Sequence, residues 1–119
     1  MNHRFRWHER LHREADFTRV IRQGRRVSAS GLILWTHRLP EGETPPRLGL
    51  AIPKRYGRAV DRNRLKRLLR EVFRLNKDKL LPGVDMVFSA LPMSGKPRYQ
   101  TIEPLVLALW SKSKLLSNP

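Results

Sequence analysis

The chain of 119 residues has no cysteine, only ten acidic residues and no long apolar run. The absence of cysteine excludes disulfides and thiolate metal sites. The apolar runs fall short of the roughly 20 residues that a membrane-spanning helix needs, and no charged segment followed by an apolar one opens the chain as a signal peptide would. We therefore expect a cytoplasmic protein without a membrane partner.

The acidic residues are also scattered along the chain. Glu14 and Asp16 are close in sequence, but two residues apart on a helix they do not share a face. A metal-dependent nuclease needs several carboxylates that converge on a divalent cation. His8 and His12 have the spacing of one helical face but no third ligand beside them, and no serine or histidine nucleophile is set up. We expect no catalytic residue and no metal site in the protein itself.

Positive charge dominates what is present. The chain has 25 lysines and arginines, a formal net charge of +15 and a sequence pI near 11.6. Such a field opposes compaction by self-repulsion, and a polyanionic partner offsets it. Arginine exceeds lysine, which favours bidentate phosphate contacts and stacking on bases. The composition therefore predicts a nucleic-acid partner.

The apolar pattern predicts one α+β domain over residues 1–119. A helix is expected over 13–23, strands over 31–39 and 47–52 as antiparallel neighbours, and Val27 indicates a strand before them. A further strand is expected over 84–90, and Thr101 is the predicted cap of the last helix. Residues 1–12 form a basic arm that we expect to be loosely ordered until a partner binds. The order is helix, two or three strands, helix, strand, helix, with helices mainly on one side of a sheet and the other face partly free for a ligand.

The segment 54–74 is the most informative part of the chain. Its apolar residues have the spacing of one helical stripe and are Leu65, Leu68, Leu69, Val72 and Phe73. Asp61 is the predicted N-cap, and the exposed positions are almost all cationic, whereas an ordinary solvated helix face mixes the two signs. From Arg62 to Arg74 such a helix spans roughly 18 Å, enough to contact several successive phosphates. The segment therefore predicts a rigid nucleic-acid-binding face.

The same segment resembles the signature helix of bacterial ribonuclease P protein subunits. The resemblance rests on R-N-R at 62–64 followed by L-K-R-L-L-R, and it covers roughly residues 13–110. It extends to these further positions: Phe17, Val20, Gly24, Gly49, Lys54, Arg55, Gly57, Ala59 and Val60. It implies a mixed four-stranded sheet in the order α-β-β-β-α-β-α, with a left-handed β-α-β crossover.

The resemblance also implies a function. Members of the family bind a large catalytic RNA, which with Mg²⁺ hydrolyses the phosphodiester bond that releases the 5′ leader of precursor tRNA. In this family the protein is an accessory subunit of the endoribonuclease in tRNA processing: it contacts the leader and lowers the Mg²⁺ requirement, and the resemblance implies the same role here. The implied metal is bound mainly by the RNA, and no DNA partner is expected.

Site residues follow by position. The expected contacts to the catalytic RNA are Arg62, Asn63, Arg64, Lys66, Arg67 and Arg70. The expected leader contacts, in a cleft between the first helix and the sheet, are Phe17, Trp35, Lys54 and Arg55. Three positions depart from the common pattern: Ile21 replaces a second aromatic, Trp35 replaces a tyrosine, and Pro53 replaces a small polar residue and removes an N–H donor.

Other interpretations remain open on the sequence. Phe17 and Trp35 have spacings that are equally typical of core residues. A structural RNA-binding module, such as a small ribosomal protein, shares the size and charge but needs no leader cleft. A self-sufficient basic nuclease would cleave precursor tRNA alone. A sequence-specific DNA binder is disfavoured because no pair of helices joined by a tight turn is predicted.

Overall fold

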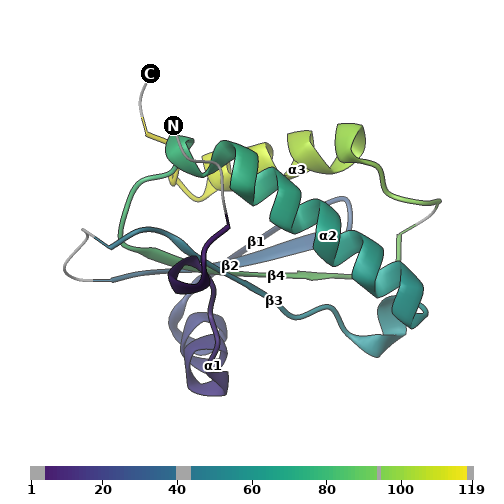
Figure 1. The fold of residues 1–119 in the computed structure, drawn as a ribbon, viewed down its shortest axis with the longest axis horizontal. Coiled ribbons are helices and arrows are strands. Elements are labelled where there is room, and N and C mark those ends of the chain that lie inside the picture. Colours follow the sequence, from purple (N-terminus) through teal and green to yellow (C-terminus); the bar gives the residue numbers. More distant parts are fainter. Residues whose placement is uncertain (1–4, 40–43, 94, 118–119) are drawn as a thin grey trace.

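The computed structural model describes residues 5–39, 44–93 and 95–117, and its elements follow the expected order (Figure 1). The helices are α1 (Glu14–Gln23), α2 (Ala59–Asn76) and α3 (Tyr99–Lys112). The strands are β1 (Arg25–Ala29), β2 (Leu32–Arg38), β3 (Arg47–Leu50) and β4 (Val84–Ala90). Short 3-10 turns are η1 (Trp7–Glu9), η2 (Lys54–Tyr56) and η3 (Lys77–Lys79).

The four strands form one mixed sheet in the order β1-β2-β4-β3. β4 pairs antiparallel with β2 and parallel with β3. The expectation that runs 31–39 and 47–52 are antiparallel neighbours is therefore wrong, because β4 lies between them. β4 is buried on both faces along nearly its whole length, so it takes an interior position, whereas the short β3 lies at the edge.

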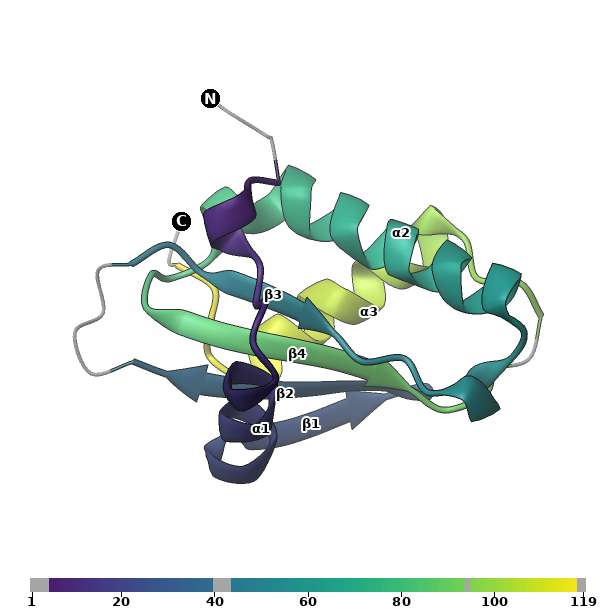
Figure 2. The same ribbon diagram turned by 60° about the horizontal axis from the view of Figure 1, so that its bottom comes forward.

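The connection from β3 through α2 to β4 is left-handed, as the resemblance implied. Figure 2 shows the sheet from the side of α1, with β3 and β4 running to the right, β3 above β4, and α3 behind the strands. Because α2 packs beside α3 on that far face, a path from β3 to β4 through α2 turns to the left. Parallel crossovers are right-handed in about 98% of cases, so this handedness is a distinctive feature of the fold.

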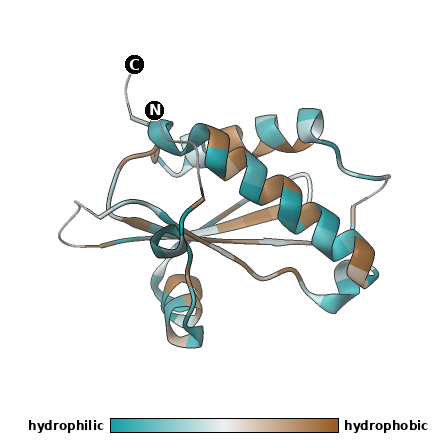
Figure 3. Ribbon diagram, in the orientation of Figure 1, coloured by the Kyte–Doolittle hydropathy of each residue, from teal (hydrophilic) through white to brown (hydrophobic). Residues whose placement is uncertain are grey.

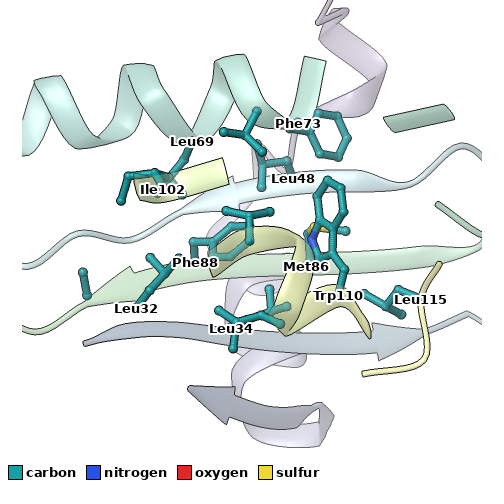
Figure 4. Packing of buried hydrophobic residues seen from close by; sticks show 14 of the residues in the cluster. Leu32, Leu34, Leu48, Leu69, Phe73, Met86, Phe88, Ile102, Trp110 and Leu115 are labelled. Atoms are coloured by element: carbon teal, nitrogen blue, oxygen red, sulfur yellow. The ribbon is translucent and has the colours of Figure 1, made fainter. Parts of the chain in front are cut away.

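The two faces of the sheet are covered differently. α2 and α3 pack over one face and enclose the main core, in which Met86 and Phe88 of β4 meet Phe73 and Trp110 (Figure 4). The Phe73 and Trp110 rings meet edge to face, with centroids 6.5 Å apart. α1 lies on the opposite face and covers only part of it (Figures 1 and 2). The expectation of helices mainly on one side is confirmed.

Two helices begin two residues before their predicted caps. α2 starts at Ala59 and α3 at Tyr99, so Asp61 and Thr101 are not N-caps but occupy the third helical position. The Asp61 carboxylate accepts the Arg58 N–H at 3.3 Å, and the Thr101 hydroxyl accepts the Arg98 N–H at 3.1 Å. Both side chains reach back to the residue before the helix and satisfy a donor there, as third-position residues of a capping box do.

A bidentate ion pair joins the edge strand β3 to β4. The Arg47 guanidinium donates to both carboxylate oxygens of Asp85 at 2.7 Å, and Asp85 is fully buried. The hydrogen bond from Arg47 to Asp85 raises the pKa of Arg47 further above its usual range. Arg47 and Asp85 are register partners, so the pair helps to set the alignment of the parallel strands.

The described part of the N-terminal arm lies against the domain. Phe5 packs edge to face on Phe73 with ring centroids 5.2 Å apart, and the Leu11 N–H donates to the Leu48 carbonyl at 2.9 Å. Arg10 forms a parallel bridge with Leu48. Residues 5–12 thereby cover the outer edge of β3, where backbone groups would otherwise lack partners.

A mostly buried ion pair anchors this arm. The Lys77 ammonium donates to both Glu9 carboxylate oxygens at 2.9 Å, and the Arg6 N–H donates to the same carboxylate at 2.8 Å. The side chains of Glu9 and Lys77 are only 7% and 12% exposed. Burial by itself raises the pKa of Glu9, but the hydrogen bonds from Lys77 and Arg6 outweigh it, so the pKa lies below its ordinary value of 4.5.

The lowered Glu9 pKa predicts a pH-dependent contribution to stability. A carboxyl with a depressed folded-state pKa stabilises the fold above its unfolded-state pKa, and this stability disappears as the pH falls through the folded-state value. We expect Glu9→Gln to lower the free energy of unfolding by about 1–3 kcal/mol at pH 7. The difference should shrink toward zero at a pH well below 4.5. Urea titrations of both proteins across this range provide the measurement, and a difference that is the same at every pH would contradict the assignment.

Candidate nucleic-acid interface

α2 separates apolar and cationic side chains onto opposite faces. Leu65, Leu69, Val72 and Phe73 are at most 1% exposed and face the sheet. In Figure 3, hydrophobic and hydrophilic residues alternate along α2 because each turn of the helix contributes residues to both faces. The outward side carries the six side chains predicted to contact the catalytic RNA: Arg62, Asn63, Arg64, Lys66, Arg67 and Arg70. The sequence prediction of one buried and one cationic face is confirmed, with Leu68, the fifth member of the predicted stripe, only half-buried.

The five cations among these six side chains have no carboxylate partners within the described residues. Arg62 donates to the Gly57 carbonyl at 2.7 Å and Arg64 to the Pro97 carbonyl at 3.3 Å. The ion pairs of α2 involve other arginines: Arg58 with Asp61, and Arg74 with Glu71. Carbonyl contacts hold a guanidinium in place without neutralising it. The face therefore keeps its positive charge and retains N–H donors for an anionic ligand.

The N-terminal half of α2 borders a hollow of about 550 Å³. Its lining residues are Arg58, Val60, Asp61, Asn63, Arg64, Arg67 and Lys96. Lys96 comes from the loop after β4, and nothing in its local sequence marks it as part of this surface. The fold thus adds a cation from a distant segment to the predicted face.

A second hollow, of about 250 Å³, joins the arm, α1, β3 and α2. Its lining residues are Phe5, Arg10, Leu11, His12, Phe17, Leu48, Gly49, Leu50, Lys66 and Arg70. It therefore brings Phe17, predicted to contact the leader, beside Lys66 and Arg70, predicted to contact the catalytic RNA. An aromatic ring bordered by cations is the arrangement that holds single-stranded nucleic acid. Arg10 and His12 are members that the sequence prediction missed.

Gly49 makes room for the Phe17 ring. A Cβ atom at Gly49 would lie 2.7 Å from two carbons of that ring, closer than any side chain tolerates. Phe17 and Trp35 both pack on the small cluster of Leu11, Val20 and Val87, and both are half-buried. The two rings are thus partly core and partly surface, and one role does not exclude the other.

The remaining predicted leader residues lie apart from this hollow. Lys54 and Arg55 are exposed in η2, between β3 and the start of α2. Lys54 lies five positions after Gly49, so at most about 18 Å of chain lies between the two residues. Trp35, on β2, does not line the second hollow either. The structure brings Phe17 together with Lys66 and Arg70 of α2. It places Lys54 and Arg55 beyond the C-terminal end of β3.

Two of the three departures, Ile21 and Pro53, have simple structural settings. Ile21 is exposed on α1, so this helix offers one aromatic ring near the cleft rather than two. The ladder between β3 and β4 ends where the Ala51 N–H donates to the Phe88 carbonyl at 2.9 Å. Pro53 follows this last bond and precedes η2, where its carbonyl accepts the Tyr56 N–H at 3.0 Å. Donors alternate along a parallel strand, so Pro53 is the next position after Ala51 that would face β4, and its missing N–H ends the ladder there.

Two features are absent from the described residues, and both bear on the kind of site present. No group of three or more histidine, aspartate or glutamate side chains in residues 5–39, 44–93 and 95–117 is arranged to hold a metal ion. Over the same ranges, no helix has the length and apolar character needed to cross a membrane.

Known proteins share both sequence and fold with this chain. The family model for ribonuclease P matches residues 5–114. The ribonuclease P protein component of Syntrophobacter fumaroxidans is 42% identical over 110 residues, covering 90% of this chain and 89% of the relative. That of Dictyoglomus thermophilum is 32% identical over 113 residues, covering 92% of each.

Solved structures agree. The RNase P protein of Staphylococcus aureus has a TM-score of 0.80 and 27% identity, covering 92% of this chain and 98% of that one. The RNase P protein of Thermotoga maritima has a TM-score of 0.74 and 27% identity, covering 87% and 96%. The family match runs from the arm to the end of α3 and so includes the whole cationic face and the cleft. The chain therefore belongs to the ribonuclease P protein family, as a member of the bacterial type.

Proposed function

We propose that this protein binds the catalytic RNA of ribonuclease P through α2. We further propose that it binds the 5′ leader of precursor tRNA through the second hollow, which is the cleft at Phe17. In the cytoplasm it assists the Mg²⁺-dependent hydrolysis that removes the leader and so matures the 5′ end of tRNA. The observation that carries this proposal is the second hollow, in which Phe17 borders Lys66 and Arg70. A structural RNA-binding module would need the cations but not the ring.

The α2 face suits a folded RNA because its cations are fixed to a rigid helix. Arg62 and Arg64 are each held by a backbone carbonyl, at 2.7 and 3.3 Å. Guanidinium groups in set positions match the phosphates of one RNA surface better than those of a random strand. Each phosphate neutralised releases condensed counterions, and this release supplies affinity that falls as salt rises.

The cleft suits an unpaired strand. A base stacked on an aromatic ring gains on the order of 1–3 kcal/mol with little dependence on base identity. Phe17 offers such a ring, Trp35 lies in the same cluster, and Lys54 and Arg55 add charge beyond the end of β3. The strand direction of β3 is the path along which we place the leader.

Mg²⁺ and the chemical step are assigned to the RNA. A bound Mg²⁺ supplies stabilisation of the negative charge that develops on a phosphate during hydrolysis. In this proposal the residues of this chain bind and orient the RNA that holds the ion. The α2 cations reduce repulsion among RNA phosphates, which is how the protein lowers the Mg²⁺ concentration that the RNA requires.

The decisive experiment is cleavage of a 5′-leader precursor tRNA at low Mg²⁺. A bacterial ribonuclease P RNA is tested with and without the protein, together with a protein-only reaction. We expect efficient cleavage only when both components are present. Tight RNA binding without stimulation at any Mg²⁺ concentration would favour the structural-module interpretation. Cleavage by the protein alone, abolished by a carboxylate substitution, would show a nuclease.

Removing charge from α2 should weaken binding of the catalytic RNA. We expect the triple variant of Arg64, Lys66 and Arg67 to glutamine to reduce affinity at least about tenfold. The slope of log affinity against log salt should become shallower by about two to three units, one for each phosphate that is no longer neutralised. Filter binding over a salt series measures both quantities, and an unchanged slope would rule out this face.

The matched control removes the same charge elsewhere. Arg38, Lys112 and Lys114 are exposed around the C-terminal end of α3, away from the N-terminal half of α2 (Figure 1). Their triple glutamine variant has the same net charge as the α2 variant. If the α2 face binds the RNA, the control should retain most of the affinity; an equal loss in both variants would indicate nonspecific attraction only.

Phe17→Leu should weaken precursor tRNA binding to the holoenzyme by about 5- to 150-fold, because a stacked base loses its flat partner. Binding of mature tRNA, which has no leader, should stay unchanged. Val20→Ala is the matched control because Val20 is fully buried in the same cluster, so its truncation perturbs packing without removing exposed ring surface. Equal losses for precursor and mature tRNA would remove Phe17 from the leader site.

A further inference from the structure

Trp7 is the most exposed large apolar side chain in the described part of the molecule. Trp7 as a whole residue is 74% exposed, whereas Trp110 is fully buried and Trp35 is half-buried. Single exposed apolar residues are common on protein surfaces, so exposure alone would mean little. The setting of this indole is what distinguishes it.

The Trp7 ring is held in place by His12. The two rings stack with centroids 4.1 Å apart and an angle of 21° between their planes. His12 Nε2 lies 2.7 Å from the Trp7 carbonyl oxygen, to which it donates as the Nε2–H tautomer. One face of the indole is thus occupied by an imidazole, and most of the remaining ring surface is open to solvent.

The segment that carries this pair is fixed at several points. Phe5 packs on Phe73, Glu9 is paired with Lys77, and Leu11 is bonded to Leu48. These contacts flank Trp7 on both sides in sequence. The indole is therefore a preorganised surface, and a ligand that stacks on it pays little conformational entropy.

His12 lines the second hollow, and Trp7 stacks on the His12 ring without lining the hollow itself. His12 and Arg10 line that hollow together with Phe17, Lys66 and Arg70. Arg10 is itself held over the Phe5 ring, with its guanidinium carbon 4.4 Å from the ring centroid. The nearby carboxylate, Glu9, is neutralised by Lys77, so the rim presents positive charge to a ligand that leaves the hollow.

We propose that Trp7, positioned by His12, stacks on an unpaired nucleobase of RNA that extends out of the cleft past the arm. The inference deepens the proposed function, on which it rests, by adding a second aromatic platform beyond Phe17. An unpaired base bordered by phosphates fits an exposed indole among cations better than an apolar peptide does. The base belongs either to the 5′ leader or to a single-stranded segment of the catalytic RNA, and the test distinguishes the two.

The test uses the reconstituted holoenzyme with Trp7→Ala and Trp7→Phe. Precursor tRNAs carry 2-aminopurine at successive leader positions, since stacking quenches its fluorescence. For a leader contact we expect one position to brighten in Trp7→Ala, and precursor affinity to fall at least about fivefold with mature tRNA binding unchanged. Trp7→Phe keeps a flat ring and should retain most of the affinity and the quenching.

A contact to the catalytic RNA gives a different result. Affinity of that RNA for the protein alone should then fall in Trp7→Ala, with no leader position affected. Unchanged affinities for both RNAs and unchanged leader fluorescence would overturn the proposal. If Trp7→Phe and Trp7→Ala lost the same RNA affinity, the proposal would also be overturned. A phenyl ring can stack on a base as an indole does, so Trp7→Phe should retain affinity if stacking is the interaction.

His12 is tested as a positioning residue. His12→Ala should give part of the Trp7→Ala defect, and His12→Phe should restore binding by restoring the ring beneath the indole. Failure of His12→Phe to rescue would remove the positioning role. Leu91→Ala is the control, since Leu91 is 44% exposed at the far end of β4. Stimulation of cleavage by the unmodified protein shows that the proposed function holds, so a null result at Trp7 would then count against this inference alone.

Discussion

Like charges along α2 repel one another, and the helix keeps them in place because its opposite face is buried. Leu65, Leu69 and Phe73 are almost completely removed from water, and burial of each such side chain stabilises the fold by roughly 1.5–3 kcal/mol. Repulsion between like charges three or four positions apart on an exposed helix face costs only about 0.2–0.5 kcal/mol for each pair. Apolar burial therefore exceeds charge repulsion, and the fold can hold an uncompensated cationic surface without its partner.

The cleft depends on how β3 is held at the edge of the sheet. The bidentate Arg47–Asp85 pair aligns β3 with β4, and this register places Gly49 beneath the Phe17 ring. On its outer side β3 is covered by the arm, which Glu9 anchors to the end of α2. The arm, α1 and β4 thus all contact β3. The aromatic and cationic residues of the second hollow come together around this short strand.

Features of the fold and site that depend on local sequence could be predicted, whereas those that depend on long-range contacts could not. The stripe and cationic face of α2 follow from a 3.6-residue period, which is a local property, and the sequence predicts them correctly. The pairing of β3 could not be predicted in this way, because the position of a strand in a sheet depends on which other strand is buried on both faces, here β4. Lys96 joins the surface only through folding, and its own sequence neighbourhood carries no signal; Arg10 belongs to the predicted basic arm, but its place in the second hollow depends on how the arm packs on β3.

Phosphate contacts and base stacking share a property that bears on selectivity: neither depends strongly on base identity. In the proposed role, a cleft built from Phe17, Lys66 and Arg70 would therefore recognise that an unpaired strand is present rather than which bases it contains. For a protein proposed to act on precursor tRNA, this favours discrimination between RNAs with and without a 5′ extension. An additional ring at Trp7 would lengthen the strand that is recognised without making the recognition sequence-specific. These residues can physically distinguish RNA strands by the length and flexibility of an unpaired extension.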